Sequence, residues 1–238
     1  MLEDGLSYPI RGDWIGRIII GGVLGFLSLL VVPAFVIVGY LVRVLERTVA
    51  GDEVPPEFDE WGDLLIKGVV GTVIIIAYTT VPLIAYGLLV TVVFGAGVGI
   101  GGDAGALIGV VGLLLALAFI PVLFLIYYAV PAALTAYAAR GEIGAAFDVA
   151  LLKPTLLSTE YLVAVLMPIV VAVITWVVSG VLAATFIGIV LVPFVQFYGQ
   201  VAVFRMFGTA FASVNERIEV GSSGGIDPIE DDIDSTPV

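Results

Sequence analysis

Long stretches of this chain contain no charged side chain. The charge-free stretches are residues 68–102, 104–139 and 161–204. The hydrocarbon core of a bilayer is about 30 Å thick, and an α-helix crosses it with roughly 20 apolar residues. Each stretch is long enough for at least one crossing, whereas a soluble domain would expose such a surface to water. The sequence therefore predicts an integral membrane protein.

Cysteine and histidine are also absent. Their absence excludes disulfides, zinc sites with Cys or His ligands, thiol nucleophiles and imidazole acid–base catalysis. Asp103 is the one acid among the long apolar stretches, so two carboxylates that share a proton are not expected in the membrane. We find no nucleophile elbow and no Walker lysine, and we expect no enzymatic activity, no catalytic or metal site and no cofactor.

Basic residues are scarce, with 9 Lys and Arg against 21 Asp and Glu and a net charge of −12. Phosphate binding needs clustered bases, so nucleic acid is not an expected partner. Only two of the bases are lysines, Lys67 and Lys153, and this balance is typical of proteins adapted to high salt, where charge repulsion is screened within a few ångströms. The composition indicates a halophilic organism.

The apolar stretches predict an all-α, polytopic membrane protein of about six helices arranged as three hairpins, with five spans as the alternative. We divide the chain into an interfacial N-terminal segment (1–17), a helical membrane domain (18–213) and an acidic disordered tail (214–238). The apolar stretch 18–42 is either a shallow hairpin broken near Val32–Pro33, which we favour, or one bent span.

The positions of the basic residues predict the orientation in the cell membrane. Bases flank the polar loops 48–63 and 140–160 and the C-terminal segment, whereas the glycine-rich turn 97–106 has none. By the positive-inside rule, both polar loops and the C-terminus are cytoplasmic. The loop 48–63 is strongly acidic, and we interpret it as solvated, with divalent-cation binding as the less favoured alternative.

A weak repeat relates two parts of the chain. Val32-Pro33-Ala34 is followed by Tyr40, Arg43 and Phe58-Asp59, and Val130-Pro131-Ala132 is followed by Tyr137, Arg140 and Phe147-Asp148. One interpretation is a duplicated helix–loop unit, as in many transporters. The other is that Pro, Tyr and Arg recur where unrelated helices leave the membrane.

Several motifs of the chain resemble those of a haloarchaeal family of multi-pass membrane proteins, catalogued as domain of unknown function 4013. The motifs are Tyr8-Pro9-x-Arg11-Gly12-Asp13-Trp14, Gly39-Tyr40-Leu41-Val42-Arg43, Pro55-Pro56-x-Phe58-Asp59-x-Trp61 and Gly144-Ala145-Ala146-Phe147-Asp148. The resemblance extends to about residue 212 and implies a polytopic membrane protein of a halophilic archaeon. It implies no activity and no site residues.

Uncharged polar side chains inside the apolar stretches are the remaining site candidates: Tyr78, Thr79, Tyr127, Gln196 and Gln200. Gln196 and Gln200 are four residues apart and share one helix face. These side chains either line a small polar cavity beside proline-broken helices or form hydrogen bonds between helices, which we favour and which contribute about 1 kcal/mol.

We therefore expect a non-enzymatic membrane interaction or scaffold protein that presents acidic loops to a protein partner at the cytoplasmic face, with membrane lipid around it. The alternative is a small transporter or permease-like protein. Ion-coupled transport usually needs an ionisable side chain deep in the membrane, and the apolar stretches offer none.

Overall fold

The computed structural model describes residues 2–223, except for the side chains of residues 186, 187 and 218–223. Every regular element in this part of the chain is a helix, as expected. In chain order these elements are α1 (Leu2–Ser7), η1 (Tyr8–Ile10), α2 (Trp14–Phe26), η2 (Leu27–Leu29), α3 (Val31–Val49), α4 (Trp61–Ile100), α5 (Gly102–Arg140), η3 (Ile143–Phe147), α6 (Val149–Leu156), α7 (Thr159–Ala183) and α8 (Phe186–Ser223).

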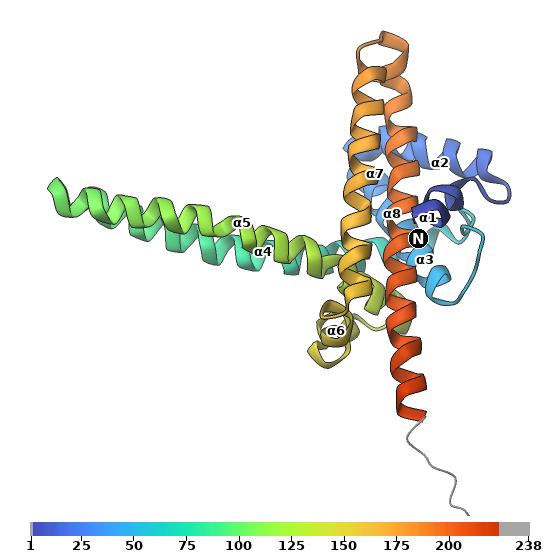
Figure 1. Ribbon diagram of the computed structural model, residues 1–238. Helices are drawn as coiled ribbons and strands as arrows, with labels where there is room; N and C mark the ends of the chain where they lie inside the picture. The colour runs from blue at the N-terminus through green and yellow to red at the C-terminus, as the bar shows by residue number, and fades with distance from the viewer. Residues whose placement is uncertain (1, 224–238) are drawn as a thin grey trace, which may run out of the picture.

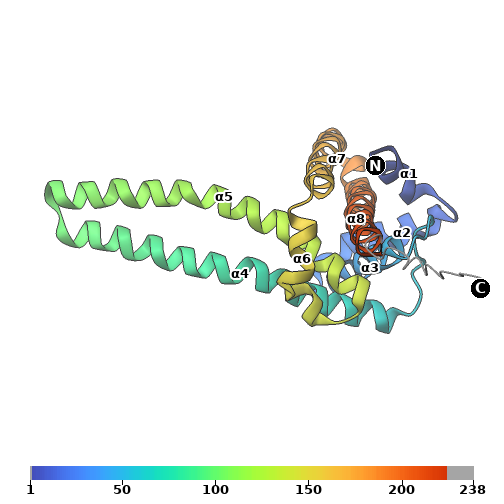
Figure 2. The ribbon, with the colours of Figure 1, turned by 60° about the horizontal axis from the view of Figure 1, so that its bottom comes forward.

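The two longest helices, α4 and α5, form an antiparallel hairpin that extends away from the rest of the molecule as an arm (Figures 1 and 2). They contain 40 and 39 residues. The turn between them is the predicted glycine-rich one, where Gly101 and Gly102 have φ of 66° and 59°. These values lie in the left-handed region that favours glycine. The outer part of the arm has no other element packed on it (Figure 1).

A second hairpin, α7–α8, runs crosswise to the arm, and the remaining helices gather around its middle and lower parts (Figure 1). Helix α3 is the central element, because it packs against α4, α5 and α8. The largest buried hydrophobic cluster joins α3, α4, α5, α7 and α8, and a second one joins η1, α3, α4 and α8. Apolar packing is thus concentrated where the two hairpins meet.

Four helices are long and apolar enough to cross a membrane: Trp61–Ile100, Gly102–Arg140, Thr159–Ala183 and Gly188–Arg217. A fifth span is obtained if the bent pair Leu2–Ile10 and Trp14–Leu29 counts as one. The all-α polytopic fold is therefore confirmed. The described residues hold four or five candidate spans, so the alternative of five agrees with the structure better than six.

The first apolar stretch is broken earlier than expected. The chain leaves helical geometry at η2 and at Leu30, which is extended with ψ of 115°. Pro33 lies in the first turn of α3, where a missing N–H removes no hydrogen bond, so it starts a helix instead of kinking one. The expected break at Val32–Pro33 is corrected to 27–30.

The prolines in the long apolar helices do not interrupt them either. Helix α4 continues through Pro82, α5 through Pro121 and Pro131, α7 through Pro168 and α8 through Pro193. The expectation of proline-broken helices beside a cavity is therefore wrong. At the C-terminus, α8 continues to Ser223, beyond the start of the predicted tail at 214, and residues 224–238 of that tail lie outside the described part.

The crossing of α3 and α4 depends on two glycines. A Cβ atom at Gly39 would overlap the carbonyl oxygen of Leu64, and one at Gly68 would overlap that of Phe35. Backbone atoms cannot move aside as flexible side chains can. The two helices therefore approach closely only because both positions lack a side chain.

We predict that Gly39→Ala lowers the free energy of unfolding by about 1–3 kcal/mol, the usual cost of overpacking. Gly87→Ala in α4 is the matched control, because nothing lies within 4 Å of a Cβ built at this position. Thermal denaturation in detergent measures both variants. Equal melting temperatures would contradict the close crossing.

Candidate functional site

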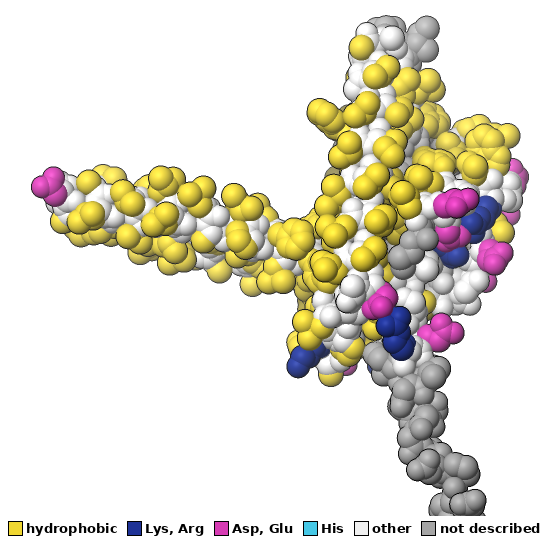
Figure 3. Space-filling view, viewed as in Figure 1, with side chains coloured by type: hydrophobic (Ala, Val, Ile, Leu, Met, Phe, Trp, Pro, Cys, Tyr) yellow, Lys and Arg dark blue, Asp and Glu magenta, His cyan; other side chains and the backbone are white. Residues whose placement is uncertain are grey.

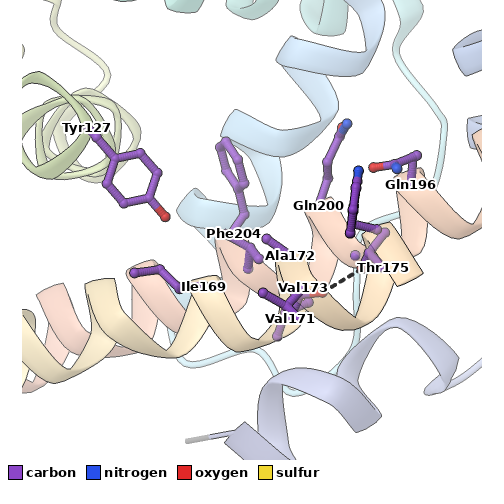
Figure 4. Close-up of a pocket in the computed structure, with 12 residues that line it drawn as sticks. Tyr127, Ile169, Val171, Ala172, Val173, Thr175, Gln196, Gln200 and Phe204 are labelled. Atoms are coloured by element: carbon purple, nitrogen blue, oxygen red, sulfur yellow. Dashed lines mark hydrogen bonds between the residues drawn. The ribbon is translucent and has the colours of Figure 1, made fainter. Parts of the chain in front are cut away.

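Three of the five predicted polar residues line one cavity. Tyr127 of α5, and Gln196 and Gln200 of α8, face a space of about 670 Å³ between α5, α7 and α8 (Figure 4). This volume lies in the range of small-molecule sites, about 300–1,000 Å³. Most of the other lining side chains are apolar, among them Ile169, Trp176 and Phe204 of α7 and α8.

The other two predicted residues lie elsewhere. The Tyr78 hydroxyl donates to the carbonyl oxygen of Ala146 at 2.6 Å and fastens η3 to α4. The Thr79 hydroxyl donates to the carbonyl oxygen of Ile75, one turn earlier in the same helix, at 2.7 Å. The two side chains thus serve packing and their own helix, and they do not reach the cavity.

The polar side chains that line the cavity differ in whether they have a hydrogen-bond partner. The Gln196 amide donates to the Ser179 hydroxyl at 3.2 Å and links α8 to α7, as expected for an interhelical hydrogen bond. The Thr175 hydroxyl donates to the carbonyl oxygen of Val171 at 2.7 Å (Figure 4). The Gln200 side chain is exposed and forms no hydrogen bond among the described residues. The site therefore offers an uncharged amide in apolar surroundings, which suits an uncharged amphipathic ligand.

Gln196 and Gln200 also line a second cavity, of about 280 Å³, beside the first. Its further lining residues come from α2 and α3 and include Gly25 and Ile37. Ser28 of η2 adds a hydroxyl group, which donates to the carbonyl oxygen of Gly25 at 2.6 Å. The two glutamines therefore border two neighbouring cavities along one face of α8.

A different polar site lies at the opposite end of α3, in the acidic loop between α3 and α4. Sequence reasoning interpreted this loop as solvated, but its backbone is held by three arginines that are 9% exposed or less, Arg17, Arg43 and Arg205. Arg17 donates to the carbonyl oxygen of Pro55, and Arg205 donates to that of Asp52 at 2.7 Å. Helices α2, α3 and α8 thus each contribute one arginine to the same loop.

Arg43 has the most contacts of the three arginines. Its guanidinium forms ion pairs with Asp59, with Asp63 at 2.8 Å and with Glu60 at 3.4 Å. Burial alone would lower the pKa of Arg43, but the hydrogen bond to Asp63 and the negative charge of Asp59 outweigh it and raise the pKa above its usual value. Arg43 therefore stays charged and keeps the end of the loop against α3.

Aromatic packing fixes the middle of the loop. The Tyr40 hydroxyl donates to the carbonyl oxygen of Pro56 at 2.9 Å, and its ring stacks on Phe58 with centroids 4.1 Å apart. Phe58 in turn lies 6.0 Å from the ring of Trp61 at the start of α4. The resulting cluster brings together Tyr40, Phe58 and Trp61, which belong to two separate motifs of the chain.

The N-terminal segment completes this site from the outside. Arg205 binds Asp4 at 3.1 Å and lies over the ring of Tyr8, with its central carbon 4.5 Å from the ring centroid. Tyr8, which the sequence places in an interfacial segment, is fully buried there. Arg11 also binds Asp4, at 2.6 Å, and thereby ties η1 to α1.

The outer surface of the loop remains acidic. Figure 3 shows acidic side chains gathered over α1 and the loop, while the arm is covered by hydrophobic side chains except at its tip. Glu53 and Glu57 are exposed, and their carboxylates have no basic partner within residues 2–217. The same described part of the chain contains no cluster of three acids that could hold a metal ion. The fixed loop therefore presents free carboxylates at its outer surface.

A family model matches residues 26–184, which is more than half of the chain, and its description is protein of unknown function (DUF4013). The chain belongs to this family. The match includes the loop and the motifs that begin at Gly39, Pro55 and Gly144, whereas α1, the motif at Tyr8 and all of α8 lie outside it. No curated protein and no solved structure matches the chain.

Sequence reasoning missed the buried arginines because they bind residues far away in the chain. Arg205 is 153 positions from Asp52 and 201 positions from Asp4. The available signal was position: each of the three arginines borders a charge-free apolar segment, where an unpaired charge is costly.

We predict that Arg43→Met makes the loop more accessible to a glutamate-specific protease that cleaves after Glu57. A hydrogen bond to a charged group contributes about 1.5 kcal/mol, so local opening and the cleavage rate should rise about tenfold. Arg47→Met is the control, because the Arg47 side chain is 56% exposed and binds only Asp52. Equal cleavage of the two variants would show that Arg43 does not hold the loop.

Proposed function

We propose that the protein is a non-enzymatic membrane interaction or scaffold protein, which uses its acidic loop to bind a basic surface of a protein partner. The loop lies between two helices whose other ends are apolar, so it is presented at the edge of the membrane. A scaffold needs a surface whose geometry is fixed before binding, because ordering a flexible loop reduces affinity.

One observation carries this proposal: the loop is fixed from inside by Arg17, Arg43 and Arg205 while Glu53 and Glu57 point outward without a basic partner. A flexible solvated loop would not require three buried charges. Electrostatic complementarity mainly determines specificity and association rate, and the partner surface should therefore carry lysines or arginines.

The proposal includes the place of action. In this proposal the acidic loop, the segment 140–160 and the C-terminus lie on the cytoplasmic side of the cell membrane, in accordance with the positive-inside rule. With 21 acids and two lysines among nine bases, the chain is suited to a halophilic archaeon. In high salt, exposed charges are screened over a few ångströms, so the carboxylates act by direct contact.

We predict that the double variant Glu53→Gln, Glu57→Gln co-purifies with much less of a protein partner than the unchanged protein does. The protein is captured from its native membranes in high salt, and the amount of each co-purified protein is measured. Two exposed ion pairs of about 0.5 kcal/mol each correspond to a loss of about fivefold. Stability should not change, because neither carboxylate contacts another described group.

The control is the double variant Glu142→Gln, Glu216→Gln, which removes two exposed acids outside the loop. It changes the net charge by the same amount, so it should retain the partner. Equal retention by the loop variant and the unchanged protein would refute the scaffold function.

A second function, a small transporter or permease, is favoured by the glutamines between the two cavities. Gln196 and Gln200 line both spaces, so an uncharged polar solute could exchange hydrogen bonds with them while moving from one cavity to the other. Against it, Gln196 already bonds to Ser179. The cavity residues therefore support this function less directly than the arginines support the scaffold.

We predict that the double variant Gln196→Leu, Gln200→Leu lowers the free energy of unfolding by only about 1 kcal/mol per lost hydrogen bond and preserves any cellular phenotype of the protein. Thermal denaturation and complementation of a deletion strain measure the two effects. A stable variant that fails to complement would place the transporter function first.

A further inference from the structure

Helix α6 has an apolar outer face, which is unusual for a short connecting helix. Leu152 and Thr155 face the core. The exposed positions 149, 150, 153, 154 and 157 recur along the opposite side, and they are apolar except for Lys153. Val149 and Leu157 are 71% and 75% exposed. Exposure to water would be unfavourable for such a surface, at about 25 cal/mol per Å².

Two tyrosines hold this segment in place. The Tyr78 hydroxyl donates to the carbonyl oxygen of Ala146 at 2.6 Å, and the Tyr128 hydroxyl donates to that of Leu156 at 2.7 Å. Asp148 begins α6 by accepting hydrogen bonds from the backbone N–H groups of Ala150 and Leu151. The apolar face is therefore a fixed surface, and it does not turn inward.

Among the described residues, the two bases that have no partner lie at or beside this segment. Arg140 ends α5 and Lys153 lies on the outer face of α6, and neither side chain forms an ion pair or a hydrogen bond within residues 2–217. The other seven bases each bind a carboxylate or a carbonyl oxygen: Arg11, Arg17, Arg43, Arg47, Lys67, Arg205 and Arg217. In a chain of net charge −12, two bases of one short region that lack a described partner need an explanation.

The weak internal repeat shows how Arg140 comes to lack a partner. In the first copy, Asp59 binds Arg43. The corresponding Asp148 of the second copy caps α6 instead. It therefore forms no ion pair with Arg140, although both line the same cavity. The capping bonds also reduce the repulsion that Asp148 would exert on an anion.

We propose that the α5–α7 connection, residues 141–158, lies in the membrane–water interface, where Arg140 and Lys153 bind the phosphate groups of anionic lipids. An interfacial helix buries its apolar face at the boundary of headgroups and acyl chains, and a lysine on that face extends its ammonium group to the headgroups. Figure 3 shows this arrangement over α6, a basic side chain among hydrophobic ones. A lipid covers the apolar face with its acyl chains and binds the bases with its phosphate group, whereas a soluble anion binds only the bases.

Space for a headgroup is present beside Arg140. A cavity of about 510 Å³ between α5, α6 and α8 is lined by Arg140, Asn215 and Leu151, among others. Among the nearby acids, Glu160 is paired with Arg217 at 2.8 Å, so its charge is partly neutralised. Glu142 is exposed and unpaired, and it is the main local charge that opposes an anion.

The first test compares lipids added to the purified full-length protein in a neutral detergent. Phosphatidylglycerol should raise the melting temperature, whereas phosphatidylcholine and inorganic phosphate should not. Each base near a membrane surface contributes about fivefold to binding, so Arg140→Gln and Lys153→Gln should each raise the half-maximal lipid concentration by that factor. Arg47→Gln, the control, removes an exposed base elsewhere and should leave it unchanged.

Three outcomes would overturn the proposal. One is an unchanged lipid response in the double variant Arg140→Gln, Lys153→Gln, and another is an equal response to inorganic phosphate. The third is that the acidic residues 227–234 bind this surface in place of lipid. In that case a chain ending at Ser223 would respond to phosphatidylglycerol, whereas the full-length chain would not.

The second test measures the depth of α6 in liposomes. The chain has no cysteine, so Val149→Cys and, as the control, Glu142→Cys can each be labelled with a nitroxide. The label at 149 should collide more often with oxygen, which is concentrated in lipid, than with a water-soluble nickel chelate. The label at 142 should show the opposite preference. A preference for nickel at both positions would place α6 in water and refute the interfacial position.

Discussion

Three buried arginines hold the polar end of this molecule together, and the arrangement of the helices depends on them. Arg17 comes from α2, Arg43 from α3 and Arg205 from α8, and all three bind the loop that leads into α4. A buried charge without partners costs several kcal/mol, so displacing the loop would leave the three arginines buried and unpaired at that cost. The loop is therefore part of the core at this end, while apolar packing around α3 is what joins the two hairpins.

The long apolar helices were predictable from the sequence, but the polar contacts were not. Charge-free stretches predict α4, α5, α7 and α8 because a bilayer excludes unpaired charge, and glycines predict the turn at Gly101. The break before α3 was misplaced because Pro33 was taken as an interruption, whereas proline also suits a first helical turn. Helix periodicity placed Gln196 beside Gln200, but only the packing of α5 against α7 and α8 brings Tyr127 to them.

The arginine-bound loop, the glutamine cavity and the α6 surface use polar groups in three different ways. In the loop, charge is paired and fixed, so that only outward carboxylates remain free. In the cavity, the polar groups are uncharged, which keeps the cost of placing them among apolar side chains low. At α6, two bases are left without acids. The chain thus separates negative charge, neutral polarity and positive charge into different regions, although acids outnumber bases throughout.

The length of the arm has a consequence for its setting in a bilayer. The uncharged part of α4, residues 68–100, is about 50 Å long at 1.5 Å per residue, whereas the hydrocarbon core is about 30 Å thick. Keeping all of it within hydrocarbon requires the axis to incline by about 55° from the membrane normal. An arm so inclined becomes steeper in a thicker bilayer and flatter in a thinner one. Bilayer thickness would then act on the angle of the arm, and through the crossing at Gly39 and Gly68 it would also act on α3 and the loop that it carries.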